Sequence, residues 1–177
     1  MIKKVFKDWT WFEKILLFGS IILVSSVSFI FRSDFMTAVT SLVGIATALL
    51  LAKGKVAGQF FGVAIVILYS FVSFQNRYYG EMIIYTFIML PLYIVGIVSW
   101  MKNRNKETKR VEPNTISKKE WILIFCISII FFIGFYYLLK HFNTSELFWS
   151  TLSIIGSMYA VYLVARRSKV RIFILFV

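Results

Sequence analysis

The sequence predicts an all-α membrane protein, and three observations lead to this prediction. Hydrophobic residues make up 59% of the 177 residues and charged residues only 16%, whereas a soluble domain carries about 25% charged residues. Aromatic residues reach 19%. The mean hydropathy is +0.80, and the apolar residues form long stretches without Asp, Glu, Lys or Arg. The same composition excludes a disordered chain and, with Cys126 as the single cysteine, a disulfide scaffold.

Six stretches are long enough to be complete transmembrane helices, since a helix needs roughly 17–25 mainly apolar residues to cross a bilayer. They are 15–31, 35–52, 56–74, 82–100, 121–139 and 147–165. A seventh apolar stretch begins near Ile172 and runs to Val177, and six residues of helix rise only about 9 Å. We therefore expect the natural protein to continue, with the seventh helix incomplete at residue 177.

Local signals mark the start of the first helix and a break in the fourth. Thr10 and Glu13 have the spacing of a capping box, which predicts a helix start there. Pro91 lies in the middle of 82–100, where it removes a backbone donor and predicts a kink that serves either packing or a hinge. Tryptophans stand at or near the segment ends, where indole rings favour the membrane interface: Trp9, Trp11, Trp100, Trp121 and Trp149.

The basic residues alternate along the chain and predict an orientation. Lys and Arg number 4, 1, 2, 1, 7, 1 and 4 in the segments before, between and after the six stretches. Assigning the richer set to the cytoplasm places 17 inside and 3 outside, as the positive-inside rule requires. The N-terminus and the loop 101–120 are therefore predicted to be cytoplasmic. We interpret the net charge of +12 as this topology signal; a polybasic lipid or nucleic-acid site is the alternative, and no nucleic-acid partner is expected.

The two halves of the chain resemble each other, which predicts a parallel repeat. Residues 13–18 resemble 120–125, and Leu50-Leu51-Ala52-Lys53 resembles Leu163-Val164-Ala165-Arg166 at an offset of 113. We therefore expect one transmembrane domain, 1–177, made of a first three-helix unit (1–74), a linker helix (82–100) and a second, truncated three-helix unit (121–177). This 3+1+3 seven-helix bundle is a transporter architecture, with the substrate site near the bilayer midplane between the units.

Acid, base and metal chemistry is missing from the apolar stretches. The eight acidic residues and His141 all lie outside them, so neither a proton relay nor an intramembrane enzyme is expected. No catalytic residue, metal site or cofactor is predicted.

The polar groups that remain inside the stretches are phenols, hydroxyls and one amide. Such a cavity suits a flat aromatic ring that carries a sugar or alcohol, since rings stack and polar groups fix orientation. Taken singly, most such hydroxyls bond their own backbone and most tyrosines are packing or interface residues. The predicted substrate-binding residues are Gln59, Tyr69, Tyr85, Tyr93, Thr151 and Tyr159. The predicted outer mouth consists of Gln75, Asn76, Tyr79 and Glu81.

One region is distinctive: Leu68-Tyr69-Ser70-Phe71-Val72-Ser73-Phe74-Gln75-Asn76-Arg77-Tyr78-Tyr79-Gly80-Glu81, then Leu90-Pro91 and Gly96-Ile97-Val98-Ser99-Trp100. This region resembles the PnuC-type vitamin and nucleoside transporter family. The resemblance implies a seven-helix fold related to the SWEET sugar transporters, a homotrimer in the cell membrane, and facilitated diffusion. It further implies that the substrate is nicotinamide riboside and that a cytoplasmic kinase traps it by phosphorylation.

Two alternatives stay open at this point. Members that carry nicotinamide riboside tend to have Asn and Gln near the positions of Tyr85 and Tyr93, so a deoxynucleoside, thiamine or riboflavin is an alternative substrate. A substrate-capture subunit of an ATP-driven vitamin importer is the alternative of another class.

Overall fold

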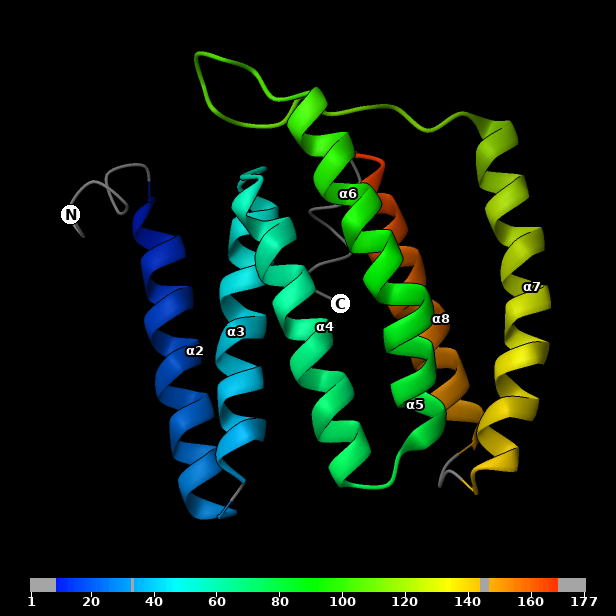
Figure 1. Ribbon diagram of the computed structural model, residues 1–177. Helices are drawn as coiled ribbons and strands as arrows, with labels where there is room; N and C mark the ends of the chain where they lie inside the picture. The colour runs from blue at the N-terminus through cyan, green and yellow to red at the C-terminus, as the bar shows by residue number, and fades with distance from the viewer. Residues whose placement is uncertain (1–8, 33, 144–146, 169–177) are drawn as a thin grey trace.

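The computed structural model describes residues 9–32, 34–143 and 147–168. These residues form a row of helices (Figure 1): α2 Trp11–Ile30, α3 Phe35–Ala52, α4 Ala57–Gln75, α5 Tyr79–Ile84, α6 Leu90–Lys102, α7 Lys118–His141 and α8 Leu147–Ala165. A π-helical segment, η1 (Tyr85–Met89), joins α5 to α6, so that Tyr79–Lys102 is one continuous helical span.

The helices confirm the predicted all-α membrane protein. α3 and α8 coincide with the predicted stretches 35–52 and 147–165, and the other helices differ from prediction by at most four residues at an end. Five spans are long and apolar enough to cross a membrane, namely α3, α4, α5–α6, α7 and α8, and α2 adds a shorter apolar segment, Lys14–Ile30. The start of the predicted seventh helix falls on residues 169–177, which lie outside the described residues.

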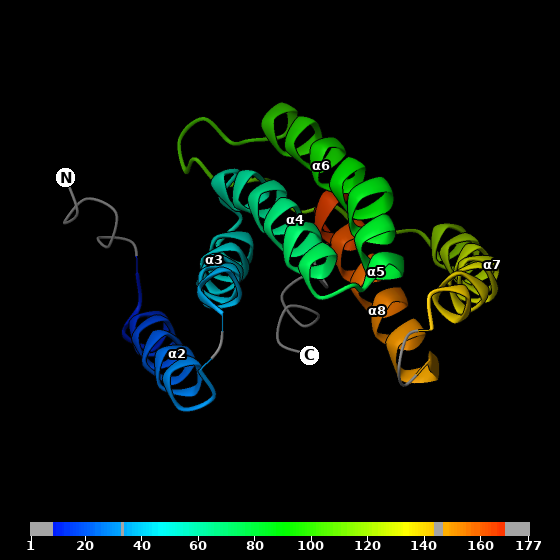
Figure 2. The same ribbon diagram turned by 60° about the horizontal axis from the view of Figure 1, so that its bottom comes forward.

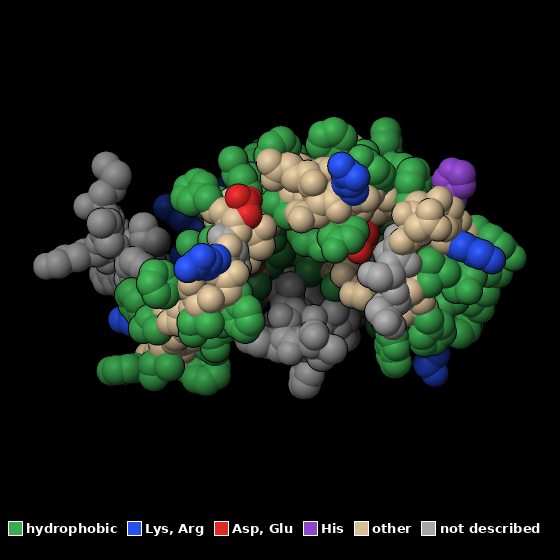
Figure 3. Space-filling model, turned by 90° about the horizontal axis from the view of Figure 1, so that it is seen from below, with side chains coloured by type: hydrophobic (Ala, Val, Ile, Leu, Met, Phe, Trp, Pro, Cys, Tyr) green, Lys and Arg blue, Asp and Glu red, His purple; other side chains and the backbone are tan. Residues whose placement is uncertain are grey.

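The helices alternate in direction, so the molecule has two distinct ends (Figure 1). α2, α4 and α7 begin at the end where α3, α6 and α8 finish; we call this the loop end, because the long connection 103–117 lies there. The opposite end, with the α2–α3, α4–α5 and α7–α8 turns, is the turn end. Seen from the turn end, charged side chains are few and scattered among hydrophobic ones (Figure 3).

Neighbouring helices pack in the order α2, α3, α4, α6, α8, α7 across the row (Figure 2). The core lies in the middle of this order, where Met89, Trp100, Leu163 and Val164 are fully buried. Large side chains on the two outermost helices face outward, such as Phe29 on α2 at 86% exposed and Ile130 on α7 at 71%. Lipid is the environment in which such exposed apolar surface is stable.

α3 and α8 end in the same backbone motif at the loop end. After α3, Gly54 adopts a positive φ of 67°, and its N–H and that of Lys55 donate to the Leu51 and Leu50 carbonyls. After α8, Arg167 adopts a φ of 60°, and the same pair of bonds recurs: the Arg167 and Ser168 N–H groups donate to the Val164 and Leu163 carbonyls. Both ends are Schellman caps, which satisfy the last carbonyls of a helix.

One expectation about the tryptophans needs correction. Trp100 does not lie at a lipid interface: it is fully buried, and its Nε1 donates to the Val164 carbonyl at 2.7 Å, which ties α6 to α8. Two glycines lie at close helix contacts, Gly62 beside Tyr93 and Gly96 beside Gln59. At Gly156 a Cβ would meet nothing within 4 Å.

Candidate functional site

A cavity of about 320 Å³ lies between α3, α4, η1, α6 and α8. Tyrosines from three successive elements line it: Tyr69 from α4, Tyr85 from η1 and Tyr93 from α6. The rest of its lining is Leu51, Ile65, Val66, Met89, Ser157, Ala160, Val161 and Val164. The described residues that line it carry no charge, so the cavity offers aromatic faces and hydroxyls to a ligand.

The tyrosines form a connected aromatic wall. The rings of Tyr69 and Tyr85 have centroids 4.4 Å apart and planes tilted by 39°. Tyr85 interacts through its hydroxyl with Ser157 on α8, and Tyr69 interacts with the Glu81 carboxylate near the turn end. Each of these two phenols therefore has a polar group beside it.

The π-helical segment explains why Tyr85 and Tyr93 face the same cavity. An α-helix turns about 100° per residue, so two residues eight positions apart would point about 80° away from each other. In η1 the Leu90 N–H donates to the Tyr85 carbonyl, five residues back. This wider turn takes up one additional residue, which reduces the angle to about 20°. It also makes room for Pro91, which has no N–H and would clash with a carbonyl in a regular α-helix.

Three of the predicted substrate-binding residues lie outside the cavity lining. Gln59 is fully buried against Gly96, and neither its Oε1 nor its Nε2 has a hydrogen-bond partner. Thr151 is also fully buried and its hydroxyl donates to the Leu147 carbonyl at 2.7 Å. Tyr159 lines a separate apolar pocket of about 390 Å³, together with Pro91. The structure thus brings together Tyr69, Tyr85 and Tyr93 but not these three.

The predicted outer-mouth residues gather at the turn between α4 and α5. Gln75 and Asn76 are exposed, and the Asn76 Nδ2 donates to the Val72 carbonyl at 2.9 Å. Tyr79 is half-buried with its ring 6.0 Å from that of Phe142. Glu81 lies in the first turn of α5 and interacts with Tyr69, so this group connects the turn end to the cavity wall.

The cavity also has a wall that the sequence prediction missed. Ser157, Ala160, Val161 and Val164 all line it, and their spacing of three and four residues marks one face of α8. This helical spacing could have identified the wall. It was missed because three of the four side chains are small and apolar and carry no chemistry of their own.

A second polar cluster ties α7 to α8 at the loop end. Arg166 donates through Nε and Nη2 to the two Glu120 oxygens at 2.7 and 3.0 Å, and the Tyr162 hydroxyl donates to Glu120 Oε1 at 2.9 Å. The hydrogen bond with Glu120 raises the pKa of Arg166 above its ordinary value. Because this cluster lies away from the cavity lining, we assign it to helix pairing.

Comparison with known proteins places the chain in a family. The sequence model of one family, described as the nicotinamide mononucleotide transporter, matches residues 34–177. The chain belongs to this transporter family. The resemblance seen in the sequence is thereby confirmed, and with five spans long enough to cross a membrane the chain is a multi-pass protein of the cell membrane.

Two curated relatives within this family are named nicotinamide riboside transporter PnuC. The protein from Neisseria mucosa is 29% identical over 133 residues, 72% of this chain and 50% of the relative. The protein from Haemophilus influenzae is 22% identical over 99 residues, 55% of this chain and 44% of the relative. The chain therefore spans about half the length of these relatives.

The fold agrees with a solved structure of the family. The crystal structure of the vitamin B3 transporter PnuC superposes with a TM-score of 0.77 at 22% identity, covering 98% of this chain and 75% of that one. At this identity the likeness establishes the helical fold and leaves the site residues to be argued from the chain itself.

Proposed function

We propose that the chain carries nicotinamide riboside across the cell membrane by facilitated diffusion. The observation that supports this most directly is the cavity walled by Tyr69, Tyr85 and Tyr93, in a chain whose relatives are named for that substrate. Its volume of about 320 Å³ falls at the lower end of the roughly 300–1,000 Å³ typical of small-molecule sites.

The chemistry of the ligand matches the lining. Nicotinamide riboside joins a flat, positively charged pyridinium ring to a ribose. Aromatic faces attract a cationic ring by stacking and by cation–π interaction. The phenol groups and Ser157 offer hydrogen bonds to the ribose hydroxyls.

The proposed substrate contacts differ in where the structure places them. Tyr69, Tyr85 and Tyr93 contact the substrate in the arrangement described here. Gln59 becomes a contact when α4 and α6 move apart, because its amide has no partner while they are packed together. Thr151 and Tyr159 are carried over from the sequence prediction alone.

The proposed architecture is the 3+1+3 parallel repeat, with units 1–74 and 121–177 on either side of the linker helix 82–100. Two features support it. α2 and α7, the first helices of the units, begin at the same end (Figure 1). The Schellman caps after α3 and α8 centre on Gly54 and Arg167, which are separated by the same offset of 113 that relates the two halves of the sequence. In this architecture the loop end is cytoplasmic and a seventh helix completes the second unit.

Assembly and energy coupling complete the proposal. The exposed apolar faces of α2 and α7 suit a homotrimer within lipid. The uncharged lining of the cavity suits transport down a substrate gradient, with a cytoplasmic kinase trapping the product by adding a phosphate that the cavity does not accommodate.

Uptake by proteoliposomes tests the proposal. The purified protein should take up nicotinamide riboside down its gradient, without ATP and at an initial rate unchanged when the proton gradient is collapsed. A parallel thermal-shift series with thiamine, riboflavin and deoxynucleosides compares the alternative substrates, since bound ligand stabilises the folded state. Strict dependence on an ion gradient or on an ATPase would reject facilitated diffusion, and stabilisation by another vitamin alone would replace the substrate.

A further inference from the structure

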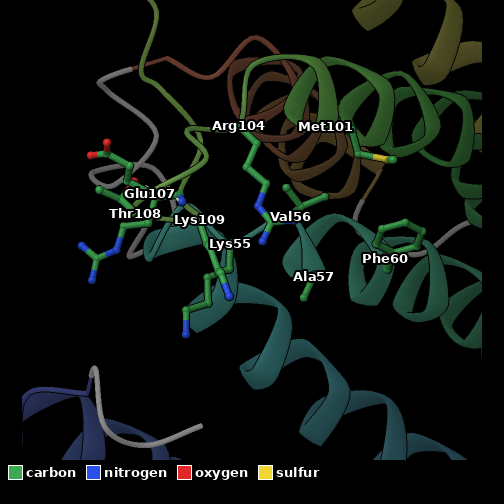
Figure 4. A pocket seen from close by; sticks show the side chains of 10 residues that line it. Lys55, Val56, Ala57, Phe60, Met101, Arg104, Glu107, Thr108 and Lys109 are labelled. Carbon is green, nitrogen blue, oxygen red and sulfur yellow. Dashed lines mark hydrogen bonds between the residues drawn. The ribbon is translucent and has the colours of Figure 1, made fainter. Parts of the chain in front are cut away.

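A second pocket lies at the loop end, apart from the tyrosine cavity. It has a volume of about 850 Å³ and lies between the α3–α4 turn, the start of α4, the end of α6 and the loop that follows α6. Figure 4 shows Arg104 extending toward the start of α4, whereas the Glu107 carboxylate points away from it. The two pockets share no lining residue.

The charges around this pocket are strongly unequal. Four basic side chains line it, Lys55, Arg104, Lys109 and Arg110, against one acidic residue, Glu107. Among the described residues no carboxylate forms an ion pair with Arg104, Lys109 or Arg110. The first turn of α4 adds to the positive potential, because Val56 and Ala57 line the pocket and no side chain caps that helix start.

The loop that carries these cations is folded. A loop whose basic residues served only to orient the protein in the membrane would not need to fold. Arg104 and Val111 form an antiparallel bridge, the Asn105 N–H donates to the Arg110 carbonyl at 2.9 Å, and the Asn105 side chain accepts from the Glu107 and Thr108 N–H groups. Val111 is buried, and its N–H donates to the Gly54 carbonyl at 2.9 Å. The backbone that carries the basic side chains is therefore held over the α3–α4 turn.

The pocket floor is apolar and continuous with the lipid-facing surface. Phe60 on α4 and Met101 on α6 line it, and both are more than half exposed, at 54% and 58%. A ligand here can place an anionic group among the cations and an apolar part against these two side chains.

We propose that this pocket binds a phosphate-bearing ligand at the boundary between membrane and cytosol. Arginine guanidinium groups bind phosphate through paired, charge-assisted hydrogen bonds, and lysine adds a further positive charge. The phosphate comes either from an anionic phospholipid headgroup or from a soluble nucleotide. The shared chemistry is the phosphate, and the source is decided by experiment.

The test compares two charge-matched triple variants of the whole chain. One removes pocket cations (Arg104→Gln, Lys109→Gln, Arg110→Gln), and the control removes exposed lysines that do not line the pocket (Lys102→Gln, Lys106→Gln, Lys119→Gln). In the lipid arm, phosphatidylglycerol retained by protein from mixed nanodiscs is counted by native mass spectrometry. In the soluble arm, protein in phosphatidylcholine nanodiscs is titrated with inorganic phosphate and with ATP.

Loss of binding in the pocket variant, by about fivefold for each charge removed and beyond the loss in the control, supports the site. The arm in which this occurs identifies the source. Equal losses in both variants, or no binding in either arm, overturn the proposal in favour of a diffuse topology signal. If the pocket variant does not fold, Glu107→Gln decides: it removes the opposing charge and should tighten binding about fivefold, and unchanged binding would refute the site. These readouts do not involve transport, so they are independent of the proposed function.

Discussion

Tyr69 and Tyr85 pack ring against ring in the wall of the cavity. Their ring centroids are 4.4 Å apart, and both rings line the cavity. We expect Tyr69→Ala and Tyr85→Ala each to weaken substrate binding several-fold, because a lost aromatic pairing costs about 0.5–1.5 kcal/mol beyond the buried area. Isothermal titration of the purified variants measures this loss.

A matched control is available on α7. Tyr137 is 66% exposed and does not line the cavity, so Tyr137→Ala should leave the affinity unchanged. Equal affinities for all three variants, with normal folding, would mean that Tyr69 and Tyr85 are packing residues.

Gln59 presents the opposite situation, a polar group in an apolar contact. Both amide atoms lack a partner in a fully buried position, and such a group costs about 1–3 kcal/mol. Gln59→Met should therefore raise the melting temperature in detergent while lowering the rate of uptake, if the amide serves the substrate in a state where α4 and α6 have separated. A variant that is both more stable and fully active would assign Gln59 no role in transport.

At this scale, sequence reasoning could identify the types of side chain and only some of their positions. Tyr69, Tyr85 and Tyr93 were selected because polar aromatic residues are uncommon within long apolar stretches, and they lie together. Thr151 was selected because it carries a hydroxyl within an apolar stretch, yet this hydroxyl donates to the carbonyl of Leu147, one turn earlier. Whether a polar side chain faces the cavity or bonds within its own helix depends on how the helix is rotated about its axis. The amino-acid composition of a stretch does not determine this rotation.

Among the elements, η1 is the segment on which the cavity depends most. It brings Tyr85 and Tyr93 to the same face and accommodates Pro91. Pro91→Ala restores a backbone N–H, so that α5 and α6 can join as a regular α-helix, and the two tyrosines would then point about 80° apart. We expect normal insertion with substrate affinity reduced by about tenfold. Wild-type affinity would show that the π-helical segment persists without proline, and circular dichroism with thermal melting controls for folding.

Sequence reasoning performed unevenly across the elements. Helix positions follow from hydrophobic length, so α3 and α8 could be delimited to the residue. Pro91 predicted a kink but not a π-helical turn, because the form of the accommodation depends on which carbonyls the neighbouring helices leave accessible. The folded loop after α6 was not predicted, since backbone hydrogen bonds to Gly54 and Arg167 arise from proximity in space and leave no residue pattern.

For the whole molecule, the distribution of basic residues gives an orientation that can be tested directly. In a Cys126→Ser background, a cysteine at Arg77 should react with an impermeant thiol reagent in intact cells, because it lies at the turn end. A cysteine at Asn105, at the loop end, should react only after the cells are permeabilised. Labelling of both sites in intact cells would contradict the assignment of the loop end to the cytoplasm.

The loop after α6 is joined to the ends of both α3 and α8 by hydrogen bonds of the main chain. The Val111 N–H donates to the Gly54 carbonyl, and the Asn114 N–H donates to the Arg167 carbonyl, at 2.9 and 2.8 Å. Main-chain bonds do not depend on side-chain identity, so substitutions of Glu112 or Pro113, which lie between the two donors, leave both bonds in place. Proline at either donor position would remove a bond, because proline lacks the N–H. Insertion or deletion of a residue between the two donors would also break a bond, because it moves one donor away from its acceptor. In related sequences this short interval should therefore vary freely in composition while its length stays constant.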